Sequence, residues 1–167
     1  MGSFRKRYKQ VLMSWSDKIQ VKKGDLGEEI IKNYLESKGW IVYKPITDKA
    51  HYFDMFCTKN KNKVIALDVK TKARLNKYEA TGIDIRHYND YKRASEDIGI
   101  DFYLFFVDDK NGMVHCQELK KLPKPFKINE KIYAWYLKDM IHLFTLSNEI
   151  IKNLSKFDSR NYLYKPN

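Results

Sequence analysis

Asp68 and Lys70 stand two residues apart at the end of an apolar segment, and this spacing could support metal-dependent chemistry on a phosphate. Residues 64–67 have the apolar character that is typical of a buried strand. Side chains alternate along a strand, so Asp68 and Lys70 are expected on the same face. Burying either charge is unfavourable unless it is paired, and the two residues are therefore predicted to belong to a site.

A second acid, Asp54, lies in the preceding apolar and aromatic segment, residues 51–60. If the two segments pair as a hairpin around the turn-prone residues 59–62, Asp54 and Asp68 can lie near one another. Neighbouring carboxylates repel unless a cation lies between them, and Mg²⁺ is the hard, oxygen-preferring ion that suits such a pair. Lys70 could then orient or deprotonate a water and stabilise charge on a phosphate.

The acid-x-Lys tripeptide alone carries little information, because this chain is rich in lysine. It occurs five times, beginning at Glu36, Asp68, Asp90, Asp108 and Glu118. The other four copies fall in helical, turn or strand-end contexts, where a solvated surface pair is sufficient. Only Asp68 closes an apolar strand that follows an acid-bearing strand, so the context and not the tripeptide indicates a site.

A third candidate acid, Glu28, lies in residues 25–38, whose apolar positions recur with helical periodicity before Gly39. Glu28 borders the apolar stripe and could reach the sheet, whereas Glu29 points to water. The alternative is that Glu28 is a first-turn glutamate favoured by the helix dipole.

These segments together resemble the PD-(D/E)XK nuclease superfamily, which includes restriction endonucleases and Holliday-junction resolvases. The resemblance covers about residues 24–110 and rests on the helix acid, the strand acid and the acid-x-Lys strand. It implies a restriction-endonuclease-like core that cleaves phosphodiester bonds with Mg²⁺, for which Mn²⁺ could substitute. The implied catalytic residues are Glu28, Asp54, Asp68 and Lys70, and the implied metal ligands are Asp54, Asp68 and the Val69 carbonyl.

The chain also departs from the superfamily pattern. Phe53 precedes Asp54 where the superfamily often has proline, and Asp68 stands where glutamate is commoner. Members often place a Gln or Lys on the helix after the acid-x-Lys strand. In this chain the candidates for that position are Arg86, His87 and Lys92, and the sequence does not decide among them.

The charge balance indicates a polyanionic partner. Thirty-two Lys and Arg residues against 21 Asp and Glu residues give a net charge of +11, which favours nucleic acid. The alternative is a lysine-rich composition without ligand significance. Basic residues cluster in residues 5–23 and 59–74, and the predicted DNA-contacting residues are Arg5, Lys6, Arg7, Lys22, Lys23, Lys72 and Arg74.

The order of predicted elements indicates an α/β domain with a central mixed β-sheet flanked by helices. We expect a basic N-terminal arm over residues 1–23, a nuclease-like domain over 24–157 and a tail over 158–167. Within the domain, residues 73–82 and 120–131 are expected to be polar and basic loops. Helices are predicted at 25–38, 88–97 and 147–154, and strands at 40–45, 51–60, 63–72, 101–109, 111–119, 132–137 and 140–146.

Several other features argue against alternative functions. No apolar run is long enough to span a membrane and no secretory signal is evident, so a cytoplasmic protein without a membrane partner is expected. Cys57 and Cys116 have no metal-ligand spacing and are predicted to be core thiols. No Gly-rich phosphate loop is present, so ATP use is not indicated.

The remaining aromatic and histidine residues are interpreted as structural. Tyr133, Trp135 and Tyr136 could stack on bases, but core packing in a strand is the favoured interpretation. His115 and His142 lie in strand patterns and are expected to be structural.

The sequence therefore predicts a Mg²⁺-dependent DNA endonuclease that acts on duplex or branched DNA, with a homodimer as a plausible form. The alternative is a non-catalytic nucleic-acid-binding module on the same fold. Salt-sensitive DNA binding would not separate the two, whereas a metal ion between Asp54 and Asp68 would.

Overall fold

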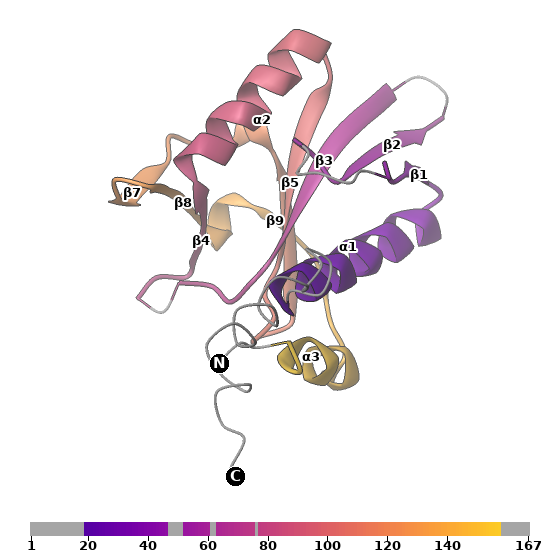
Figure 1. Cartoon of the computed structure of the whole chain (residues 1–167), viewed down its shortest axis with the longest axis vertical. Helices are drawn as coiled ribbons and strands as arrows, with labels where there is room; N and C mark the ends of the chain where they lie inside the picture. Colours follow the sequence, from indigo (N-terminus) through magenta and orange to yellow (C-terminus); the bar gives the residue numbers. More distant parts are fainter. Residues whose placement is uncertain (1–18, 47–51, 61–62, 76, 158–167) are drawn as a thin grey trace, which may run out of the picture.

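The computed structural model describes residues 19–46, 52–60, 63–75 and 77–157 (Figure 1). Its main element is a six-stranded sheet with the strand order β1-β2-β3-β5-β6-β9. Only the β3–β5 pair is parallel, so the sheet is mixed, as predicted. The strands are β1 (Ile41–Tyr43), β2 (Met55–Lys59), β3 (Lys63–Thr71), β5 (Asp101–Val107), β6 (Met113–Glu118) and β9 (Ile141–Thr145).

The predicted hairpin is present between β2 and β3. The two strands pair antiparallel from Met55 opposite Leu67 to Lys59 opposite Lys63. Asn60 begins the connection with φ of 60°, a left-handed conformation that asparagine tolerates better than most residues. The hairpin brings the two candidate acids to the same part of the sheet.

Helices cover both faces of the sheet (Figure 1). One face of β3, with Ile65 and Leu67, packs against α1 (Ile19–Ser37). The opposite face contributes Ala66 to a second core, which also contains Tyr91 of α2 (Ile85–Ile98). Because side chains alternate along β3, Ile65 and Leu67 face α1, whereas Ala66 faces α2. A third helix, α3 (Asn148–Ser155), contributes to the core on the α1 side.

Helix α1 begins at Ile19, before the predicted start at residue 25. Residues 19–23 of the predicted basic arm therefore form the first turn of this helix. Its end agrees with the sequence prediction, because Gly39 has φ of 80° and the N–H of Trp40 bonds to the carbonyl of Leu35. This left-handed glycine terminates the helix in the usual way.

A close approach fixes α1 against β3. Gly27 is buried in α1, and a Cβ added there would overlap Thr71 Oγ1 of β3. Glycine thus lets the helix backbone lie directly on the strand that carries Asp68 and Lys70. The next residue in the helix is Glu28, so this contact also sets the position of the candidate helix acid.

A second, three-stranded sheet, with the order β4-β8-β7, contains segments that the sequence analysis assigned to loops. β4 (Ala80–Asp84) overlaps the predicted loop at 73–82, and β7 (Phe126–Asn129) lies inside the predicted basic loop at 120–131, so both assignments were wrong there. Both strands pair with β8 (Ile132–Tyr136), which is remote in sequence from β4. The prolines and lysines of this segment are typical of a loop, and β7 forms a strand because it pairs with β8.

The prediction that the two cysteines are core thiols is confirmed. Cys57 and Cys116 are free and buried, as expected of core thiols. His115 is buried, whereas His142 is exposed at the sheet edge. No helix in the described part of the chain has the length and apolar character needed to cross a membrane.

Candidate active site

Asp54, which directly precedes β2, lies near Asp68 of β3. Met55 is the first residue of β2 and pairs with Leu67, and the N–H of Asp54 bonds to the same Leu67 carbonyl at 2.9 Å. The two carboxylates are close enough for the charge of Asp68 to act on Asp54. Both aspartates are largely buried, with 9% and 3% of their surface exposed. The structure thus brings together the two acids expected from the sequence.

The backbone of β3 holds Asp54 in place. The N–H of Val69 donates a 2.7 Å hydrogen bond to Asp54 Oδ2. Val69 was expected to contribute its carbonyl to a metal site, and the structure adds this role for its N–H. One carboxylate oxygen of Asp54 is thereby oriented by the residue between Asp68 and Lys70.

Lys70 lies beside Asp68 on the same strand face. Lys70 Nζ is 2.7 Å from Asp68 Oδ2, a buried oxygen. Lys70 retains partial exposure, whereas Asp68 does not. The ammonium therefore partly neutralises a buried carboxylate while remaining accessible from solvent.

Burial and the neighbouring carboxylates change the protonation of Asp54. Burial, together with the negative charges of Asp68 and Glu28, raises the pKa of Asp54 to about 8, against the opposing effects of the Val69 hydrogen bond and Lys70. One Lys70 cation does not compensate three neighbouring acids. The site without a metal ion accordingly favours a protonated Asp54 at neutral pH.

Glu28 is close enough for its charge to act on Asp54, but its nearest described partner is Lys44, at 2.7 Å. Burial alone would lower the pKa of Lys44, but the hydrogen bond and the charge of Glu28 raise it above its ordinary value. The side chain of Glu28 is 14% exposed, so this ion pair lies at the margin of the core. Glu28, which α1 positions near the site, thus acts on Asp54 through its charge.

Tyr91 of α2 completes the site and was missed by the sequence analysis. Its pKa is raised by burial, by the charge of Asp68 and by a hydrogen bond with Asp68. Lys70 Nζ also lies 5.5 Å from the centre of the Tyr91 ring. Tyr91 therefore contacts both members of the acid-x-Lys pair. Its place in the buried stripe of α2 made it resemble a core aromatic in the sequence.

The other candidates on α2 contribute less. The ring of His87 stacks on Tyr91 with centroids 6.1 Å apart, so it supports that residue from behind. Arg86 is exposed, and Lys92 is exposed with Glu96 as an ion-pair partner at 4.0 Å. None of the three makes a described contact with Asp68.

The donor set fits a Mg²⁺ ion of the kind that proteins hold with one or two carboxylates and several waters. Among the described residues, no group of three or more His, Cys, Asp and Glu side chains converges as a complete protein cage. Two neighbouring, largely buried aspartates and a raised Asp54 pKa are nevertheless the features that a divalent cation would relieve. Asp54, Asp68 and the Val69 carbonyl are the residues that would hold it.

Lys72 lies behind the site and not on its surface. Burial, together with the charge of Lys70, lowers the pKa of Lys72 to about 8, against the opposing charge of Asp68. Its Nζ donates a hydrogen bond to the Gly82 carbonyl of β4. Its predicted contact with DNA stays a prediction, and the structure shows it joining the two sheets.

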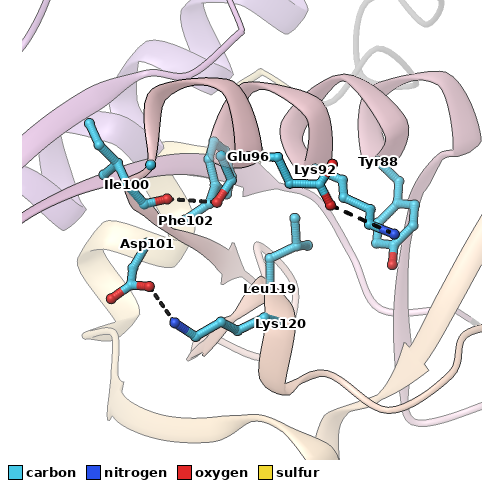
Figure 2. Close-up of a pocket in the computed structure, with 10 residues that line it drawn as sticks. Tyr88, Lys92, Glu96, Ile100, Asp101, Phe102, Leu119 and Lys120 are labelled. Atoms are coloured by element: carbon cyan, nitrogen blue, oxygen red, sulfur yellow. Dashed lines mark hydrogen bonds and ion pairs between the residues drawn. The ribbon is translucent and has the colours of Figure 1, made fainter.

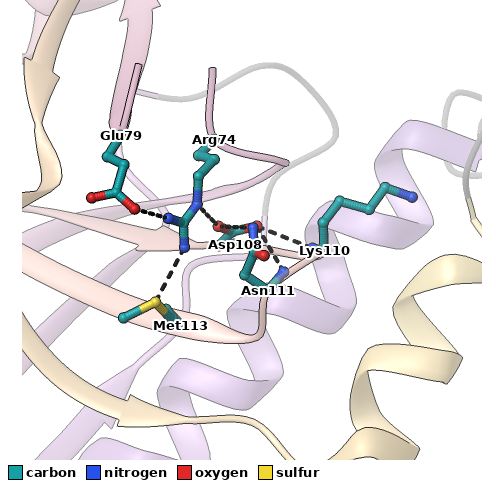
Figure 3. Close-up of polar contacts among 6 residues, drawn as sticks. All are labelled: Arg74, Glu79, Asp108, Lys110, Asn111 and Met113. Atoms are coloured by element: carbon teal, nitrogen blue, oxygen red, sulfur yellow. Dashed lines mark hydrogen bonds and ion pairs between the residues drawn. The ribbon is translucent and has the colours of Figure 1, made fainter. Parts of the chain in front are cut away.

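Other predicted DNA-contacting residues also have partners within the protein. Arg74 Nε lies 2.7 Å from a carboxylate oxygen of the fully buried Asp108, and Arg74 also contacts Glu79 (Figure 3). Lys23 pairs with the buried Asp109, whereas Lys22 is exposed. Arg5, Lys6 and Arg7 lie outside the described residues.

A separate cavity of about 340 Å³ lies between α2 and the start of β5 (Figure 2). It is lined on one side by Tyr88 and Lys92, and on the other by Asp101 and Lys120, which form an ion pair at 2.5 Å. None of the candidate catalytic residues lines it. The candidate active site is therefore the acidic cluster on β2 and β3 and not this cavity.

Comparison with solved structures identifies the fold. The chain is similar to Hjc, a Holliday junction resolvase from Archaeoglobus fulgidus, with a TM-score of 0.53 and 13% identity, over 70% of this chain and 90% of that chain. The chain has the restriction-endonuclease-like fold. The predicted fold class is thus confirmed, although such low identity shows the fold alone.

Two further solved structures resemble the chain more weakly. A bacterial homing endonuclease matches with a TM-score of 0.43 and 16% identity, over 75% of this chain and 78% of that chain. A nuclease from a fusselovirus matches with a TM-score of 0.42 and 13% identity, over 82% of this chain and 90% of that chain. No protein-family model and no curated protein sequence matches the chain.

Proposed function

We propose that this chain is a Mg²⁺-dependent DNA endonuclease that hydrolyses phosphodiester bonds. The observation that carries the proposal is the neighbouring pair of buried aspartates, Asp54 and Asp68, with Lys70 2.7 Å from Asp68. Burying two acids together destabilises a protein, and such unfavourable arrangements concentrate at functional sites. The restriction-endonuclease-like fold supports the same conclusion.

Each residue has a definite part in the proposed mechanism. Bound Mg²⁺ would supply Lewis-acid activation of a water and of the phosphate oxygens. Asp54 and Asp68 would hold the ion as carboxylates, because a nearby positive charge would offset the burial and the repulsion that raise the pKa of Asp54. Lys70 would donate a hydrogen bond to the phosphate or to the attacking water, and Tyr91 would orient Asp68 through its hydrogen bond.

The net charge of +11 supports a nucleic-acid substrate. We propose duplex or branched DNA as the substrate, and a homodimer as the form that would cut two strands. The alternative of a non-catalytic binding module has no specific observation in its favour, because a module would gain nothing from the buried acidic pair.

The test is cleavage of end-labelled duplex, branched and single-stranded DNA with Mg²⁺, with Mn²⁺ or with a chelator. Asp68→Asn should reduce the cleavage rate at least about a hundredfold while the circular dichroism spectrum is unchanged. Asp97→Asn, a change of the same type on the exposed side of α2, is the matched control and should cleave like wild type. Metal-independent cleavage, or an active Asp68→Asn variant, would contradict the proposal.

A further inference from the structure

The two faces of the β4-β8-β7 sheet differ in exposure. Trp135 and Tyr133 pack toward α2, where their ring centroids lie 5.6 Å and 5.5 Å from that of Tyr88. Tyr136 follows Trp135 in β8 and therefore projects from the opposite face, where it is 40% exposed. The prediction that this aromatic segment packs in the core is therefore confirmed for Tyr133 and Trp135 and wrong for Tyr136.

The outward face carries a row of three aromatic rings. Phe126 of β7 stacks on Tyr136 with centroids 4.8 Å apart and an interplanar angle of 28°. Tyr78, which precedes β4, meets Phe126 edge-on at 5.9 Å and is 38% exposed. We call this row the aromatic row, Tyr78–Phe126–Tyr136. The rings stabilise one another in a fixed arrangement that presents apolar surface to solvent.

A groove follows the aromatic row. It has a volume of about 400 Å³ and lies between the segment before β4 and strand β7. Ile128, itself 38% exposed, contributes apolar surface to this groove. The lining residues are Leu75, Lys77, Tyr78, Phe126, Lys127 and Ile128.

Lysines flank the aromatic row at both ends. Lys77 Nζ lies 5.6 Å from the centre of the Tyr78 ring, and Lys138 Nζ lies 5.4 Å from that of Tyr136. Neither lysine forms an ion pair with an acid in the described ranges. Lys127, in the groove, pairs with the exposed Glu130 at 3.7 Å. The surface thus combines exposed aromatic faces with cations that remain available to an anionic ligand.

We propose that the aromatic row and its lysines bind a single-stranded segment of DNA. Aromatic faces stack on unpaired bases, and lysines hold the phosphates that connect them. Intact duplex DNA does not offer its base faces, and a second copy of this chain would oppose lysines with lysines. The choice of DNA rests on the proposed endonuclease function, and the site would recognise an unpaired segment near the cleaved phosphate.

The aromatic row is fixed relative to the candidate active site. β3, which carries Asp68 and Lys70, leads through residues 72–79 directly into β4. Lys72 Nζ donates to the Gly82 carbonyl, and this hydrogen bond attaches β4 to the strand that bears the site. A substrate held by both surfaces would therefore have a defined register.

The experiment measures DNA affinity in the absence of cleavage, by fluorescence anisotropy with the Asp68→Asn protein and a chelator. The probes are oligo-dT, an abasic strand of the same length and a duplex. Adding Tyr136→Ala should weaken oligo-dT binding by about fivefold to a hundredfold. Binding of the abasic strand and of the duplex should change less than about twofold, because neither probe offers unpaired bases for stacking.

Three controls distinguish the explanations. Tyr136→Phe keeps the ring and should keep affinity, and Lys138→Ala should reduce the salt dependence of oligo-dT binding. Tyr43→Ala removes a 60% exposed tyrosine from β1, in the other sheet, and should have no effect. Circular dichroism melts establish that each variant is folded.

The outcomes separate this inference from the proposed function. Loss of oligo-dT affinity in Tyr136→Ala supports the binding surface even if the wild-type protein cleaves no DNA. Unchanged affinity in Tyr136→Ala, or no binding of oligo-dT by the parent, would overturn the inference even if the wild-type protein is an active endonuclease. A dimer that dissociates in Tyr136→Ala would reassign the surface to self-association and would also overturn it.

Discussion

Asp54 Oδ2 accepts a 2.7 Å hydrogen bond from the backbone N–H of Val69, the residue between Asp68 and Lys70. This bond fixes the first acid of the site against the strand that carries the second acid and the lysine. Because the donor is a backbone N–H of β3, the position of the Asp54 carboxylate relative to Asp68 and Lys70 is set by how β2 and β3 pair. Precise placement of this kind is what a metal-dependent site requires.

Asp54→Asn is expected to stabilise the metal-free protein by about 1–2 kcal/mol at neutral pH. The folded pKa of Asp54 is about 8, against an ordinary value of 3.8. Between these values the folded state binds more protons than the unfolded state, so stability falls as pH rises. Asparagine does not carry this penalty, and it keeps an oxygen for the Val69 N–H.

The measurement is urea unfolding of both proteins in a chelator at the two ends of that pH interval. The advantage of the variant should increase with pH and should disappear near the lower end. Asp97→Asn, on the exposed side of α2, should show no such trend. Equal pH dependence in wild type and Asp54→Asn would show that Asp54 does not titrate as described.

Tyr91→Phe is expected to lower Mg²⁺-dependent cleavage by about tenfold, because residues that orient a metal ligand affect activity by 10–100-fold. The substitution removes the hydroxyl that bonds to Asp68 but keeps the ring beneath Lys70. Tyr88→Phe, one turn earlier in α2 where the ring packs on Tyr133 and Trp135, is the matched control. A cleavage rate and pH profile equal to wild type would exclude a positioning role for Tyr91.

Arg74→Met is expected to destabilise the protein by about 3 kcal/mol, because it leaves the fully buried Asp108 without its cation. Burial alone would raise the pKa of Asp108, but hydrogen bonds from Arg74, Asn111 and Lys110 lower it. Adding Asp108→Asn should recover part of the lost stability. Denaturant unfolding gives these values.

Arg93→Met is the matched control for Arg74→Met, because Arg93 makes a largely exposed ion pair with Asp90. Its expected cost is below about 1 kcal/mol. If Arg74 served only to contact DNA, its substitution would leave stability unchanged and would reduce the salt dependence of DNA binding. That result would contradict the structural role.

Gly27→Ala is expected to destabilise the protein by about 1–3 kcal/mol, because the new Cβ would overlap Thr71 in β3. Gly24→Ala, one turn earlier in α1, meets no atom within 4 Å and should instead stabilise the helix slightly. Thermal unfolding compares the two. Equal effects would show that the close approach of α1 to β3 is not constrained by Gly27.

Local patterns were sufficient to predict the central part of the fold. Apolar periodicity identified the helix that contains Gly27 and the hairpin that joins β2 to β3. These features depend on residues close in sequence, where the periods of helix and strand are directly visible. Strand β7 was missed because its partner strand, and the hydrogen bond from Trp135 to the Pro123 carbonyl, define it.

The sequence by itself predicted the hairpin that brings Asp54 near Asp68 and the shared face of Asp68 and Lys70. Side-chain alternation and a short turn leave few other arrangements. Only the tertiary structure decided that Tyr91 contacts Asp68 and Lys70, that Lys72 is half-buried and bonded to Gly82, and that Tyr136 is exposed. Those outcomes depend on how α2 and the second sheet pack on the first, and contacts between remote segments are not encoded in any local period.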